Sequence, residues 1–85
     1  MSNDKDLLHK VRRAFHESFG TDPETVIPGA GPDDIPGWDS LGHAVLAANL
    51  EEALDTTFDI DELMAMEDVT AILAVANDKL ADVPA

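Results

Sequence analysis

The chain has 85 residues, enough for one domain but too few to enclose the deep pocket that most enzymes need. It carries 18 acidic side chains against five basic ones, a formal net charge of −13, which disfavours nucleic-acid binding and favours protein partners with basic surfaces. Cysteine is absent, so any thiol chemistry would need an attached prosthetic group. The sequence shows neither a secretory leader nor an apolar run long enough to span a membrane, so we expect a cytoplasmic protein without membrane insertion. We also expect a monomer.

The first predicted element is a helix over residues 4–19. Its apolar side chains recur at the spacing of one helix face, namely Leu8, Val11, Phe15 and Phe19, flanked by Leu7 and Ala14. Gly20 is the expected end of the helix, because glycine readily adopts the left-handed conformation that terminates helices. Four of the five basic residues lie in this segment, and we interpret them as part of its solvated face.

Residues 21–39 are predicted to form a long crossover, because four prolines and three glycines exclude a regular helix there. A connection of this length is usually functional when it occurs in a small domain. We expect an ordered loop with a mobile stretch at residues 29–31. The apolar side chains expected to anchor the loop in the core are Val26, Ile27, Ile35 and Trp38.

A second helix is predicted over residues 40–54, with Asp39 or Ser40 as its N-cap. It carries apolar side chains on two nearly opposite faces. The face expected to lie in the core comprises Leu46, Ala47, Leu50 and Leu54. The other face is either covered by the long loop or exposed for a partner, and it comprises Leu41, Ala44, Val45 and Ala48.

Two further helices are predicted, a short one over residues 61–66 and a last one over residues 68–80 that begins at the cap Asp68. The inward side chains expected on the last helix are Val69, Ile72, Leu73, Ala76 and Leu80, and residues 82–85 should fray. We expect Met64 and Met66 to fill the core or to form a pliable apolar wall. The fold class is therefore all-α: a single domain over residues 1–85, a small four-helix bundle of three longer helices and one short helix with a long first crossover.

The chemistry is expected at Ser40, which lies in the segment Ile35-Pro-Gly-Trp-Asp-Ser-Leu-Gly-His43. The unpaired amides and the dipole of a helix N-terminus favour a phosphate group, so this hydroxyl suits a phosphate-linked attachment. Alternatively, Ser40 only caps the helix of a protein–protein adaptor. A third interpretation pairs Ser40 with His43, one helical turn away, as nucleophile and base of a small hydrolase. No motif for a metal ion is recognisable, and we expect none to bind.

The stretch Gly37-Trp-Asp-Ser-Leu-Gly-His43 resembles the attachment motif of acyl carrier proteins, whose core is Asp-Ser-Leu. The resemblance continues through residues 46–52, 58–63 and 68–73. It implies that a phosphopantetheinyl transferase moves 4′-phosphopantetheine from coenzyme A onto Ser40, beside Asp39 and Leu41, which makes the chain a phosphoprotein. It also implies that the chain is a carrier and not an enzyme, with acyl groups held as thioesters on the covalent arm for acyl-loading and acyl-transferring enzymes.

In that family the second helix docks against basic partner surfaces. The residues that the resemblance and the second apolar face assign to docking are Leu41, Ala44, Val45, Ala48, Glu51 and Glu52. Carriers of general fatty acid biosynthesis usually have acids where this chain has Gly42 and Val45. The chain is therefore more similar to dedicated carriers of lipid, polyketide or amino-acid-derivative pathways, whose cargo is chosen largely by the loading enzyme.

Overall fold

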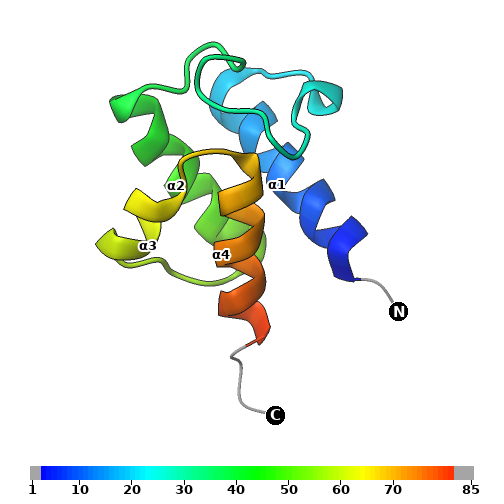
Figure 1. The fold of residues 1–85 in the computed structure, drawn as a ribbon, viewed down its shortest axis with the longest axis vertical. Coiled ribbons are helices and arrows are strands. Elements are labelled where there is room, and N and C mark those ends of the chain that lie inside the picture. The colour runs from blue at the N-terminus through cyan, green and yellow to red at the C-terminus, as the bar shows by residue number, and fades with distance from the viewer. Residues whose placement is uncertain (1–2, 82–85) are drawn as a thin grey trace.

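The computed structural model describes residues 3–81, with the side chains of residues 6–79, and this part of the chain is helical (Figure 1). Three helices are long, α1 (Asn3–Phe19), α2 (Ser40–Leu54) and α4 (Val69–Ala81), and α3 (Ile60–Ala65) is short. This confirms the predicted small bundle, and each helix begins and ends within one residue of its predicted bounds. None of the described helices is long and apolar enough to cross a membrane. The fraying expected for residues 82–85 lies outside the described residues.

The core lies between the three long helices, with α1 packed mainly against α2. The face of α2 that was predicted to be buried is buried: Leu46, Ala47, Leu50 and Leu54. On α1 the buried face is rotated slightly from the predicted one, because Leu7 and Ala14 are buried whereas Leu8 and Phe19 are only partly covered. On α4, Val69, Ile72 and Ala76 are buried and Leu73 is half-buried, while the side chain of Leu80 lies outside the described ones.

The helix ends follow local hydrogen-bonding chemistry. Gly20 has a φ of +70°, and its N–H donates to the His16 carbonyl at 2.8 Å, which ends α1 as predicted. The Asp68 carboxylate caps α4 by accepting the Ala71 N–H at 2.7 Å. A reciprocal capping box starts α3, because the Asp59 side chain accepts the Glu62 N–H while the Glu62 side chain accepts the Asp59 N–H.

The long crossover runs over one end of the bundle and contains a single 3-10 turn, η1 (Pro23–Thr25) (Figure 1). Three of the predicted anchors are buried: Val26, Ile35 and Trp38. The prediction for Ile27 is wrong, because this side chain is 50% exposed. Val26 lies in a tight turn in which the Ile27 N–H donates to the Thr25 carbonyl at 3.1 Å, and the turn leaves Ile27 outside the core although Val26 is buried.

Residues 29–31, predicted to be mobile, are attached to the bundle at Ala30. The Ala30 side chain is buried, and its carbonyl accepts the Val69 N–H at 2.8 Å, at the start of α4. The Gly31 N–H donates to the Asp34 carboxylate at 3.0 Å. Because a residue between two glycines carries no sequence signal of burial, the attachment of this stretch to α4 was not foreseen.

Helix α3 has no fully buried side chain, and polar interactions at its surface hold it to the rest of the bundle. The Lys79 ammonium on α4 donates to the Glu62 carboxylate at 2.7 Å and lies 6.0 Å from the centre of the Phe58 ring. The pKa of Glu62 is lowered, first by the hydrogen bond from Lys79 and next by the Asp59 N–H. The ion pair therefore ties α3 to α4 most strongly when Glu62 is ionised.

Replacing Glu62 by Gln should weaken the attachment of α3 to α4 near neutral pH and so destabilise the protein. Since the pKa of Glu62 is lowered in the folded state, its stabilisation is present above the ordinary value of 4.5 and is lost as the pH falls through the folded value. Urea unfolding of the wild type and Glu62→Gln at about pH 7 and about pH 3 checks this. We expect the variant to have a lower free energy of unfolding than the wild type at the higher pH, and the two free energies to become equal at the lower pH. A pH-independent difference would contradict this role for the ion pair.

Candidate functional site

Ser40 is the first residue of α2, and its side chain is exposed. The residue before it, Asp39, has extended backbone and supplies the N-cap, because its Oδ1 accepts the Gly42 N–H at 2.7 Å. Within the described part of the chain, the Ser40 hydroxyl has no hydrogen-bond partner. Of the two caps that the sequence left open, the structure therefore selects Asp39, and the serine hydroxyl is left to solvent.

Two glycines bring the loop close against the first turn of α2. Gly37 has a φ of +92°, a conformation that residues with a Cβ rarely adopt. A Cβ at Gly42 would overlap the Gly37 carbonyl oxygen and would lie 2.9 Å from the ring of Phe19. Position 42 thus has no room for a side chain larger than hydrogen in this structure.

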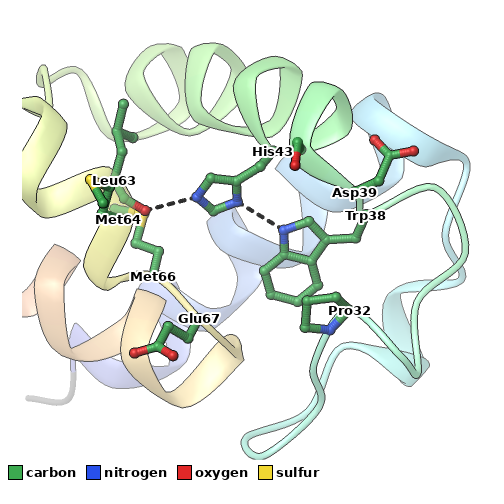
Figure 2. A pocket seen from close by; sticks show the side chains of 9 residues that line it. Pro32, Trp38, Asp39, His43, Leu63, Met64, Met66 and Glu67 are labelled. Atoms are coloured by element: carbon green, nitrogen blue, oxygen red, sulfur yellow. Dashed lines mark hydrogen bonds between the residues drawn. The ribbon is translucent and has the colours of Figure 1, made fainter.

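Trp38 anchors the loop immediately before the cap. Its ring is buried and meets Phe15 edge-on, with ring centres 5.0 Å apart and an interplanar angle of 82°. Its indole N–H donates to Nδ1 of His43 at 2.9 Å, and Nε2 of His43 lies 2.8 Å from the Leu63 carbonyl oxygen (Figure 2). We call this series of hydrogen bonds the Trp38–His43–Leu63 relay, and it joins the loop, α2 and α3.

The two hydrogen bonds of the relay determine the protonation state and the tautomer of the His43 imidazole. An indole N–H can only donate and a carbonyl can only accept, so the imidazole is neutral with its proton on Nε2. A general base must accept a proton from its nucleophile, but Nδ1 already accepts from Trp38 and Nε2 already carries hydrogen. The arrangement therefore does not support the hydrolase interpretation of Ser40 and His43. No cluster of three metal-ligating side chains occurs among the residues described.

A pocket of about 490 Å³ opens beside Ser40. One wall comes from the loop and the first turn of α2, and the other from α3 and the turn that follows it (Figure 2). Met66 is 2% exposed and belongs to the core as expected. Met64 is 74% exposed, so of its two predicted roles filling the core is wrong, whereas its place in the pocket lining fits the predicted wall. The lining residues are Pro32, Trp38, Asp39, Ser40, His43, Leu63, Met64, Met66 and Glu67.

The second apolar face of α2 is exposed rather than covered by the loop, which decides between the two alternatives that the sequence left open. Leu41 is 79% exposed and Val45 is 46% exposed, and the two small side chains of this face, Ala44 and Ala48, are also exposed. On α3, Ile60 is exposed as well. The apolar residues that the sequence assigned to docking are thus accessible.

The two acidic residues assigned to docking differ in their surroundings. Glu52 is exposed, but Glu51 is half-buried and its Oε2 accepts the Phe58 N–H at 2.8 Å. The Glu51 carboxylate therefore fastens the connection between α2 and α3. Sequence reasoning missed this role. A carboxylate that accepts a hydrogen bond from an amide in an irregular segment leaves no periodic pattern in the sequence. Sequence reasoning missed the Trp38–His43–Leu63 relay for the same reason.

Comparison with known proteins gives a partial similarity. Over 68 residues, 80% of this chain, the sequence is 35% identical to the non-reducing polyketide synthase pkdA of Emericella nidulans. The chain spans 3% of the length of that protein. No protein-family model and no solved structure matches the chain.

The assignment of the cap makes a prediction about stability. Asp39→Ala should lower the free energy of unfolding by about 1 kcal/mol, because it removes the acceptor of the Gly42 N–H. Ser40→Ala should change it by less than about 0.5 kcal/mol, because the exposed hydroxyl has no partner to lose. Urea denaturation measures both. An equal loss in the two variants would show that Ser40 shares the capping.

Proposed function

We propose that the chain is an acyl carrier protein with its attachment point at Ser40. The observation that carries the proposal is the exposed Ser40 hydroxyl at the first position of α2, in a segment where Asp39 already supplies the cap. A serine kept only to cap a helix would use its hydroxyl for that bond. This arrangement disfavours the alternative of an adaptor in which Ser40 is a cap and nothing more.

The residues around Ser40 fit a phosphodiester. The amides of Ser40 and Leu41 come too early in α2 to have an intrahelical partner, so two donors and the positive end of the helix dipole lie beside the hydroxyl. Asp39 is occupied with the Gly42 N–H, and its other oxygen could help the modifying enzyme to hold Mg²⁺. When bound, 4′-phosphopantetheine supplies the thiol that this cysteine-free chain lacks.

Ser40 would act as the nucleophile of the attachment step, with the phosphopantetheinyl transferase as catalyst. Its Oγ would form the new bond to the phosphorus that carries pantetheine, while the pyrophosphate bond of coenzyme A breaks and adenosine 3′,5′-bisphosphate leaves. The hydroxyl proton would pass to a base of the transferase, because both nitrogens of His43 are engaged in the relay.

The similarity to a segment of a polyketide synthase supports this proposal. A polyketide synthase extends acyl chains, and a small helical segment without catalytic machinery is what an acyl carrier within such an assembly requires. We therefore propose polyketide-type assembly as the pathway in preference to general fatty-acid supply. The absence of room for an acid at Gly42 also separates this chain from the general fatty-acid carriers.

Mass spectrometry tests the attachment directly. Incubation with coenzyme A and a promiscuous phosphopantetheinyl transferase should raise the intact mass by one phosphopantetheinyl group, and Ser40→Ala should abolish the gain. Thr70→Ala is the matched control, because Thr70 is also an exposed hydroxyl in the first turn of a long helix. This control should be modified fully. A wild-type chain that stays unmodified beside a carrier that the same enzyme modifies would contradict the proposal.

We also propose that enzymes with basic patches dock on the exposed face of α2, with Leu41 and Val45 as apolar contacts and Glu52 as the charged one. Glu52→Lys should slow association with the transferase, and the effect should shrink as salt screens the charges. Glu51→Ala should instead lower the free energy of unfolding, because it removes the acceptor of the Phe58 N–H.

Stopped-flow association rates at low and high salt measure the docking effect. Val45→Ala, which leaves the charge unchanged, is the comparison variant. If Glu52→Lys associates at the wild-type rate while Val45→Ala is slowed, the apolar face rather than the acid directs docking.

A further inference from the structure

Helices α2 and α3 are joined more by side chains than by close packing of their backbones. Helices α2 and α4 pack against α1, and the backbone of α3 contacts α4 more than it contacts α2. Between α2 and α3 lies the imidazole of His43, which reaches from the first turn of α2 to the Leu63 carbonyl (Figure 2). The gap between these helices is therefore bridged by a polar side chain at the end nearest Ser40.

His43 itself lines the pocket beside Ser40, so this bridge forms part of the pocket wall. Its lining includes two core residues, Trp38 at 5% exposure and Met66 at 2% exposure, and both lie next to His43 (Figure 2). Trp38 contacts Phe15, which is fully buried. A chain that entered past His43 would therefore meet the hydrophobic core directly.

A chain can pass His43 only if this side chain moves and its two hydrogen bonds break. If His43 swings away, the Trp38 indole N–H loses its acceptor while its ring is still buried, and an unpaired buried donor is unfavourable. The bond from His43 to the Leu63 carbonyl is lost as well. Only cargo that gains more from burial than these hydrogen bonds provide would enter the core.

We propose that His43 is a latch that keeps an acyl chain carried on Ser40 outside the core, in the open pocket between the loop and α3. The inference rests on the proposed carrier function and adds the class of cargo. A chain held in an open pocket stays partly in water, which suits short or oxygen-bearing acyl groups whose carbonyls need hydrogen-bond partners. A long saturated chain would leave methylenes exposed and is disfavoured.

The test loads the arm from octanoyl-coenzyme A and 3-oxooctanoyl-coenzyme A, and intact mass first confirms that each protein is fully acylated. A failure at that stage contradicts the carrier function, whereas the latch is tested only on acylated protein. The readout is the NMR shift of the Leu50 and Ile72 methyl groups, which are fully buried in the core and do not line the pocket beside Ser40. The unacylated holo form of each variant is the reference.

With the wild type, both chains should leave the core methyl shifts at their reference values. In His43→Ala the octanoyl chain should shift them and raise the melting temperature, while 3-oxooctanoyl should have a smaller effect. Trp38→Phe, which keeps a ring but removes the indole N–H, is the second variant should His43→Ala fail to fold. His9→Ala, which removes an exposed histidine on α1, is the control and should behave as the wild type.

Two results would overturn the latch. In the first, the octanoyl chain shifts the core methyls of the wild type as strongly as those of His43→Ala. In the second, neither His43→Ala nor Trp38→Phe admits the chain, in which case ordinary packing closes the core.

Discussion

The hydrogen bond from the buried indole of Trp38 to His43 is the interaction on which the arrangement around Ser40 depends. Trp38 belongs to the crossover and His43 to α2, so the bond holds the loop against the helix that it precedes. The opposite nitrogen of His43 extends the same connection to α3 through the Leu63 carbonyl. One imidazole thereby sets the relative positions of the three segments that line the pocket.

In residues 37–42, the residues that stabilise the local structure are different from the serine that we propose to be modified. Gly37 and Gly42 permit the close approach of loop and helix, Trp38 anchors the turn, and Asp39 caps the helix. Ser40, in contrast, has an exposed hydroxyl that stabilises nothing within the described residues. Because its neighbours hold it in place and its hydroxyl makes no structural hydrogen bond, the Ser40 side chain is accessible to a modifying enzyme.

The helices could be predicted closely from the sequence because each carries a local signal: apolar residues at helical spacing, a glycine after α1 and an aspartate before α4. The position of Ser40 at the start of α2 followed from the same signals. The sequence could not show that Ala30 and not Ile27 anchors the crossover, since this depends on how irregular backbone turns. The roles of Glu51 and His43 were hidden as well, because their partners are backbone groups and an indole brought near by the fold.

The central claim is that Ser40 carries a covalent arm in the living cell. Its most direct test is mass spectrometry of the chain isolated from cells that naturally produce it, with fragmentation that assigns any modification to a residue. The account predicts a 4′-phosphopantetheine group, bare or acylated, on Ser40 of the isolated protein. A correctly folded chain recovered with an unmodified Ser40 throughout the population would contradict it.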